Sequence, residues 1–288
     1  MIDSVTLFYF SGTGNSEKLA LTFYRLFRKS VSSCSVYRIE DHLRGKSRPM
    51  LQNTVAGILF PVYFFHMPRI VHTFLLSTLF SPGTRVFLIG VPSEDTIFNT
   101  TALKSARSIL KRKKATVIHE SCIPMPQNIK IKYPDAVSAR LLYAAEKRIP
   151  AIVEQILALH TERSFPNPVT AVLRLFRPAA HLRARRFGFG LRVSGKCIHC
   201  GLCIRQCPTR NIRMDIGVKF SGKCTLCMRC IYNCPAGAIS PSSGTHLPII
   251  GGYDLDSSLH SHFPMQLPHT ATRSYPRNLK SYFTKHLE

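Results

Sequence analysis

The strongest constraint in the sequence is a twelve-residue cysteine pattern that occurs twice, as CIHCGLCIRQCP from Cys197 and as CTLCMRCIYNCP from Cys224. Eight of the ten cysteines lie in these two copies. A length of 288 residues, the lack of a signal-like N-terminal segment and the regular spacing all disfavour a disulfide framework. We therefore expect a cytoplasmic protein whose clustered thiolates bind metal.

Each copy has three cysteines at tight spacing and a fourth cysteine followed by proline. One compact loop can then supply three corners of a cubic iron–sulfur cluster, and in this pattern the cysteine before proline ligates the other cluster. We expect two [4Fe-4S] clusters with exchanged ligands. The first would take Cys197, Cys200, Cys203 and Cys234, and the second Cys207, Cys224, Cys227 and Cys230. Structural zinc is the alternative, but zinc favours separated pairs over this triplet rhythm.

Residues 190–242 as a whole resemble the bacterial two-cluster ferredoxins, including the exits CPTRNI and CPAGAI after each cluster loop. The resemblance implies a small α+β domain whose two [4Fe-4S] clusters each carry one electron. The segment departs from the many acidic members of that family, because residues 191–242 hold eight basic side chains and a single acid, Asp215. Positive charge near a cluster favours its reduced form and raises its potential.

A second motif, FYFSGTGNSEKLA, lies near the N-terminus. It combines hydroxyl side chains with a glycine turn directly before a helix, an arrangement that suits a terminal phosphate. The motif has no lysine at the Walker A position and is not G-x-G-x-x-G, so it predicts neither a nucleoside triphosphate site nor an NAD site. The alternative is a tight strand–helix turn without a ligand.

The chain up to about residue 160 alternates β-rich runs with helical stretches. Such alternation predicts a doubly wound α/β domain with a five-stranded parallel sheet. The expected strands are Val5–Phe10, Ser35–Glu40, Val55–Phe60, Arg85–Gly90 and Ala115–Ser121. The first expected helix directly follows the glycine loop. Three further helices are expected over residues 68–80, 101–113 and 136–160.

Residues 1–160 resemble the flavodoxin family through this pattern and the glycine loop. The resemblance implies bound FMN, with cofactor contacts from Ser11, Gly12, Thr13, Gly14, Asn15 and Ser16. It also implies aromatic residues beside the flavin ring. Tyr63, Phe64 and Phe65 are candidates in the loop after the third strand, and because tryptophan is absent we expect the stacking residue to be Tyr63 or Phe98. The alternative places Phe64 and Phe98 in the core.

The order of the two modules, with MPQN at Met125, resembles the EFR1-type ferredoxins, in which a flavodoxin-like domain is fused to a ferredoxin domain. The domains expected are residues 1–160, a basic linker over 161–189, the cluster module over 190–242 and an irregular tail over 243–288. Cys34 and Cys122 are interpreted as small buried hydrophobes.

The formal net charge of +24 indicates a polyanionic partner, with a solvated, generally basic surface as the alternative. We expect a redox partner protein with an acidic surface and no specific nucleic acid. Seven arginines and no acid lie between Arg163 and Arg192, interleaved with apolar residues. This linker is interpreted as a solvated connector, with contact to an anionic membrane surface as the alternative.

These features favour electron transfer between two [4Fe-4S] clusters and FMN. The second hypothesis is an enzyme, a flavin-dependent reductase of a quinone or nitro compound supplied with electrons by its own clusters. The third, suggested by charge alone, is a redox-sensing or nucleic-acid-associated protein, which a steep salt dependence of DNA retention would support. A flavin edge that faces the clusters, with no free cavity, favours the carrier, and an open pocket above the flavin with room for a substrate favours the reductase.

Overall fold

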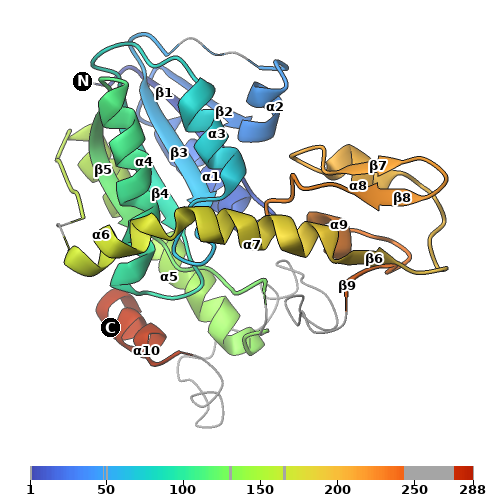
Figure 1. Ribbon diagram of the computed structural model, residues 1–288. Coiled ribbons are helices and arrows are strands. Elements are labelled where there is room, and N and C mark those ends of the chain that lie inside the picture. Colours follow the sequence, from blue (N-terminus) through green and yellow to red (C-terminus); the bar gives the residue numbers. More distant parts are fainter. Residues whose placement is uncertain are drawn as a thin grey trace.

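The computed structural model describes residues 2–47, 49, 51–129, 132–164, 167–242 and 276–287 (Figure 1). A five-stranded sheet flanked by helices forms the larger part of the protein. A smaller part, built from short strands and helices, lies to one side of the sheet (Figure 1). The long helix α7, Arg177–Phe189, runs from the larger part to the smaller one.

The sheet has the strand order β2-β1-β3-β4-β5, and each of its four neighbouring pairs is parallel. Its strands are β1 Ser4–Tyr9, β2 Ser33–Arg38, β3 Val55–Pro61, β4 Arg85–Val91 and β5 Thr116–Cys122. The expected doubly wound, flavodoxin-like sheet is therefore confirmed. The strand order reverses between β1 and β3, and the carboxyl ends of strands at such a point form the usual ligand crevice.

Helices cover both faces of the sheet and divide the core into two clusters. The helices of this part are α1 Asn15–Phe27, α2 Ile39–Leu43, α3 Arg69–Ser77, η1 Ile97–Asn99, α4 Thr100–Arg112 and α5 Asp135–Leu157. Alternate residues of β1 point to opposite faces, as the period of a strand requires: Leu7 joins the cluster under α1 and α5, and Phe8 the cluster under α2, α3 and α4. Burial on both faces explains why the strands are almost continuously apolar.

The second strand differs from the expected one. It ends at Arg38, and Ile39 and Glu40, which we expected in the strand, begin the short helix α2. Ile39 is fully buried beneath this helix. A five-residue helix has too few periodic positions to be distinguished from a strand end in the sequence.

The smaller part consists of two antiparallel strand pairs and two short helices, which confirms the expected α+β arrangement. Strands β6 Leu191–Val193 and β9 Ile239–Pro241 pair with each other, and β7 Ile212–Met214 pairs with β8 Val218–Phe220. The helices α8 Leu202–Gln206 and α9 Arg229–Tyr232 each contain the third cysteine of a triplet, Cys203 and Cys230.

The basic segment between the two parts is helical. It forms α6, Pro168–Leu175, which packs on α4, and then α7. Asn167 caps α6 by accepting hydrogen bonds from the backbone N–H groups of Val169 and Thr170. We expected a connector with one short amphipathic helix, whereas this segment forms two helices, α6 and α7.

The C-terminal segment also contains more structure than expected. Helix α10, Arg277–Leu287, packs on α5 through Leu279, Tyr282 and Phe283, each at most 3% exposed. The expectation of an irregular tail is wrong for these residues, and residues 243–275 lie outside the described part. Among the described residues, no helix is both long and apolar enough to cross a bilayer.

Candidate functional site

A cavity of about 320 Å³ opens at the carboxyl ends of the parallel strands. Its walls are the glycine loop after β1 and the loops after β3, β4 and β5. Five of the six expected phosphate-loop residues line it, namely Ser11, Gly12, Thr13, Asn15 and Ser16. The sixth, Gly14, lies behind them with a φ of 104°, a left-handed conformation that glycine adopts without strain.

The hydroxyl groups of this loop are arranged to meet a phosphate. Ser16 is 1% exposed, and its Oγ has no hydrogen-bond partner within the described residues. Thr13 Oγ1 accepts a hydrogen bond from Asn128 Nδ2 at 2.6 Å, which leaves its own proton available to an oxygen of a ligand. No side chain caps the N-terminus of α1, so the first backbone N–H groups of this helix can donate hydrogen bonds to a ligand held by the loop. The loop therefore fits an anionic phosphate group.

The loop after β3 forms the aromatic side of the cavity. Tyr63, Phe64 and Phe65 all line it. Phe64 and Phe65 both have positive φ values, 49° and 66°, within a tight turn closed by reciprocal backbone bonds between Tyr63 and His66. Bulky side chains adopt this conformation at a cost of about 1–2 kcal/mol each, and such strain is concentrated at functional sites.

The other stacking candidate, Phe98, does not line the cavity. It lies on η1, is 38% exposed, and packs edge-to-face on Phe65 with ring centroids 5.7 Å apart. It is therefore not in the core, and it can influence a bound ring only through Phe65. Tyr63 is the expected residue that does reach the cavity.

The cysteines of the smaller part gather into two groups of four. Cys197, Cys200, Cys203 and Cys234 surround one small cavity, and we call these residues quartet one. Cys207, Cys224, Cys227 and Cys230 are mutual electrostatic neighbours, and we call these residues quartet two. Each triplet is thus accompanied by the Cys-Pro cysteine of the other copy.

The chemistry of the two quartets suits metal clusters. All eight thiols are free of disulfide bonds. Burial raises the pKa of Cys227 to about 11 and that of Cys224 to about 12, and the neighbouring thiols of quartet two add to both shifts. Four such thiols ionise together only when cationic metal compensates their charge.

Within the described residues, no three Cys, His, Asp or Glu side chains are close enough to share one metal ion. In a cubic cluster each thiolate binds a different iron, so four ligand thiolates need not converge on one point. Backbone N–H groups also point at ligand sulfurs. Asn211 N donates to Cys207 Sγ at 3.2 Å, and Ala238 N donates to Cys234 Sγ at 3.3 Å.

The sequence repeat is also a repeat of backbone conformation. Left-handed φ values occur at the same three positions of each copy, as the pairs His199 and Leu226, Gly201 and Met228, and Arg210 and Gly237. The N–H···S bonds at Cys207 and Cys234 are equivalent as well. Both copies therefore wind around their sites in the same way.

Quartet two lies directly against the glycine loop. A Cβ atom on Gly12 would collide with the carbonyl oxygen of Cys227, so only glycine permits this approach. Tyr63 fills the adjacent space: its hydroxyl is buried without a hydrogen-bond partner among the described residues. Burial raises the pKa of Tyr63 well above its ordinary value, and the charge of Cys227 adds to the shift.

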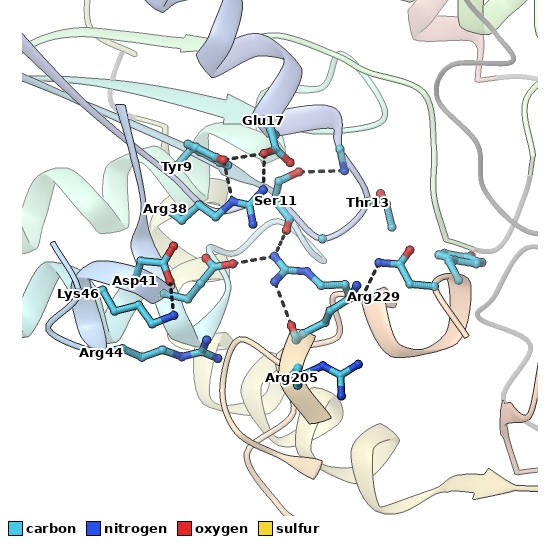
Figure 2. A pocket seen from close by; sticks show the side chains of 16 residues that line it. Tyr9, Ser11, Thr13, Glu17, Arg38, Asp41, Arg44, Lys46, Arg205 and Arg229 are labelled. Carbon is cyan, nitrogen blue, oxygen red and sulfur yellow. Dashed lines mark hydrogen bonds and ion pairs between the residues drawn. The ribbon is translucent and has the colours of Figure 1, made fainter. Parts of the chain in front are cut away.

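Arg229, between two ligands of quartet two, fastens the two parts together. It donates to the Ser11 carbonyl oxygen at 2.5 Å, to the Gln206 carbonyl oxygen at 3.0 Å and to Glu40 Oε1 at 2.8 Å (Figure 2). Tyr232 adds a bond from its hydroxyl to the carbonyl oxygen of Asn128 at 2.7 Å. Sequence analysis missed this interface; the arginine inside a cluster loop was its one available signal.

Two further contacts join the parts through helix α7 and the loop after α2. Arg183 lies over the Phe64 ring at 4.4 Å, and Arg44 Nη2 donates to the Cys207 carbonyl oxygen at 2.6 Å. Cys34 and Cys122 lie in β2 and β5, partly buried against the two core clusters, and do not contribute to either quartet.

The fold and the quartets together define a class of protein, in which a flavodoxin-like α/β domain is joined to an iron–sulfur module. Residues 191–240 match a family model described as a 4Fe-4S dicluster domain. This match supports a 4Fe-4S cluster in the smaller part and a redox role for the protein. A comparison with curated protein sequences found no match.

Several solved structures share similarity with this chain. The Trp repressor binding protein of Bacillus subtilis is 13% identical, with a TM-score of 0.38, over 56% of this chain and 99% of that one. A flavodoxin of Streptococcus pneumoniae TIGR4 is 14% identical, with a TM-score of 0.38, over 54% and 97%. An azoreductase of Bacillus anthracis is 12% identical, with a TM-score of 0.37, over 53% and 99%. The assignment of the fold rests on strand order and parallel pairing.

Proposed function

We propose that this protein transfers single electrons between two [4Fe-4S] clusters held by the two quartets and an FMN held in the cavity at the strand ends. When bound, the clusters supply one-electron chemistry, and the flavin accepts or donates one or two electrons. The organisation corresponds to that of the EFR1-type ferredoxins.

The observation that carries this proposal is the contact between Gly12 and Cys227. It makes quartet two and the phosphate loop parts of one packed interface. Tyr63 lies in the same interface and also lines the cavity, so its side chain bridges the two sites. Short separation and a dry, fixed environment are what a protein contributes to electron transfer between its cofactors.

The size of the cavity favours a carrier over a reductase. About 320 Å³ is near the lower end of the range for sites that enclose one small molecule. A bound FMN would occupy most of this volume, and the Phe64–Phe65 turn closes one side. A quinone or nitro compound would need additional space above the ring.

The test begins with anaerobic purification and with quantification of iron, sulfide and flavin on one sample. We expect about eight irons and one FMN per chain. Cys200→Ser and Cys227→Ser should each lower the iron content. Cys34→Ser is the matched control, because Cys34 is a partly buried thiol outside both quartets. Full iron content in either quartet variant would contradict the ligand assignment.

The second step addresses electron transfer itself. Rapid mixing of the chemically reduced protein with a one-electron acceptor should show cluster and flavin absorbance changing in a coupled sequence. In Gly12→Ala, the added methyl group must push the Cys227 loop away from the phosphate loop. We expect slower exchange between the cofactors at unchanged iron content. An unchanged rate would contradict the importance of this contact.

We also propose that the partner is a redox protein with an acidic surface, as the net charge of +24 supports. Association should weaken steeply as salt is raised. Retention on DNA that falls equally steeply with salt, without a redox partner, would favour the nucleic-acid hypothesis instead.

A further inference from the structure

A second cavity, of about 460 Å³, lies on the other side of the glycine loop, toward β2 and α2. It shares Ser11, Gly12 and Thr13 with the flavin cavity, but none of the loops after β3, β4 and β5 reaches it. Its remaining walls come from β2, α2 and the loop after α2 on one side, and from α8 and α9 of the iron–sulfur module on the other. It therefore exists only where the two parts meet.

The charge of this second cavity is strongly positive. Five cationic and three anionic side chains line it: Arg38, Arg44, Lys46, Arg205 and Arg229, with Glu17, Glu40 and Asp41. Each carboxylate already has a cationic partner, since Glu17 pairs with Arg38 at 2.7 Å, Glu40 with Arg229 at 2.8 Å and Asp41 with Lys46 at 3.9 Å.

Two arginines in this cavity have no such compensation. Within the described residues, no carboxylate lies within 4.0 Å of Arg44 or Arg205, and both lie below Arg229 in Figure 2. Both donate hydrogen bonds to backbone carbonyl oxygens, Arg44 to that of Cys207 at 2.6 Å and Arg205 to that of Cys200 at 2.9 Å. The Nε atom of Arg44 is buried and has no hydrogen-bond partner among those residues. Two uncompensated guanidinium groups in one cavity are suited to phosphate.

The opposite wall is suited to hydroxyl groups. Glu40 is 3% exposed, and its Oε2 atom has no hydrogen-bond donor within the described residues. A buried carboxylate oxygen without a donor is costly, and a ligand hydroxyl would remove that cost once the Glu40 side chain turns its Oε2 atom toward the cavity. A volume of about 460 Å³ is within the range of small-molecule sites.

From these observations we propose that the second cavity binds a phosphorylated, hydroxyl-bearing small molecule, such as a nucleotide or a sugar phosphate, while the flavin cavity stays occupied. Arg44 and Arg205 hold the phosphate, and Glu40 accepts from a hydroxyl group. Both arginines also bond to carbonyl oxygens of cluster-ligand cysteines, so the occupant would contact the iron–sulfur module directly.

The proposal is tested by anaerobic calorimetric titration of the full-length, cofactor-loaded protein with ADP, inorganic pyrophosphate and uncharged adenosine. We expect ADP and pyrophosphate to bind and adenosine not to bind. Arg44→Gln and Arg205→Gln should each weaken ADP binding at least tenfold. Arg213→Gln removes the same charge from an exposed position of the same module outside the cavity, and should leave binding unchanged.

Three outcomes would overturn the proposal. The first is no binding of ADP or pyrophosphate, a result that would instead favour an acidic protein surface as the partner of Arg44 and Arg205. The second is equal weakening in Arg213→Gln, which would indicate non-specific charge attraction. The third is release of flavin during titration, because the anion would then be occupying the phosphate loop. Iron and flavin contents, measured on the same samples, test the proposed electron-transfer function separately.

Discussion

The buried ion pair between Arg229 and Glu40 gives the sharpest prediction about how the two parts are held together. The Nη2–Oε1 distance is 2.8 Å, and the side chains are 15% and 4% exposed. In Arg229→Gln the Glu40 carboxylate stays buried without a cation, although one of its oxygens already has no donor among the described residues. Removing one partner of such a pair costs about 3–5 kcal/mol, which is a shift of more than about a hundredfold in an equilibrium constant.

The reverse substitution, Glu40→Gln, should cost less. Arg229 would keep its bonds to the carbonyl oxygens of Ser11 and Gln206 and would remain next to Cys227. We expect a loss of about 1.5–3 kcal/mol, the value of a hydrogen bond to a charged group. The double variant should lose less than the sum of the two single variants, since it leaves no buried charge unpaired.

The protein also provides a matched control. Lys219 and Asp215 form an ion pair with the same 2.8 Å separation, but their side chains are 56% and 63% exposed. Lys219→Gln should therefore cost at most about 1 kcal/mol.

The assay is anaerobic urea unfolding of cofactor-loaded protein, followed by circular dichroism and by flavin release, with iron content matched between variants. If Arg229→Gln proved no more destabilising than Lys219→Gln, the interface would not depend on this pair. Strict additivity of the two single changes would likewise refute the reasoning.

Further predictions concern the phosphate loop, the basic helices and a buried histidine. Thr13→Val should weaken FMN retention with an unchanged circular dichroism spectrum, because it removes the hydroxyl that Asn128 orients; equal flavin affinity would count against the phosphate site. Leu175 and Phe176 at the end of α6 are 77% and 55% exposed beside basic residues. We propose that they contact anionic membranes: Leu175→Ser should reduce cosedimentation with phosphatidylserine vesicles, and no sedimentation of the parent protein would exclude the contact. Burial lowers the pKa of His119 from 6.5 to about 4, so the unfolded chain takes up its proton first as the pH falls. Stability should fall between about pH 6.5 and 4, and less steeply in His119→Gln, which acid unfolding of both proteins would measure.

Much of the fold was predictable because the signals were local. All five expected strands match within two residues at each end, since runs such as Val55–Phe60 are buried on both faces and bounded by turns. The two triplets follow from spacing, because thiolates three residues apart must share a loop, and the exchange of Cys207 and Cys234 follows from the two-cluster pattern. Helix α10 was missed, although Leu279, Tyr282 and Phe283 have helical spacing. These three apolar residues span only about one and a half helical turns, and they follow a long segment that contains proline and serine, so the sequence signal is weak. The helix is stabilised mainly by its packing on α5.

The interface was not predictable for a different reason. Nothing near Gly12 in the sequence indicates that Cys227 will lie against it, because the pairing depends on how α7 carries the second module back to the sheet. The second cavity is likewise a product of docking, since Arg44 and Arg205 come from separate parts of the chain. Contacts between modules leave little periodic signal in either module.

The mirrored left-handed positions of the two cysteine copies have a consequence for the stability of this module. Glycine occupies the first copy at 201 but the second at 237, whereas Met228 and Arg210 stand at the equivalent places. At these two pairs, each copy therefore holds one bulky residue in a conformation that glycine adopts without strain, while the backbone follows the same course around the sulfurs. Replacing Met228 or Arg210 by glycine should relieve this local backbone strain without altering the architecture.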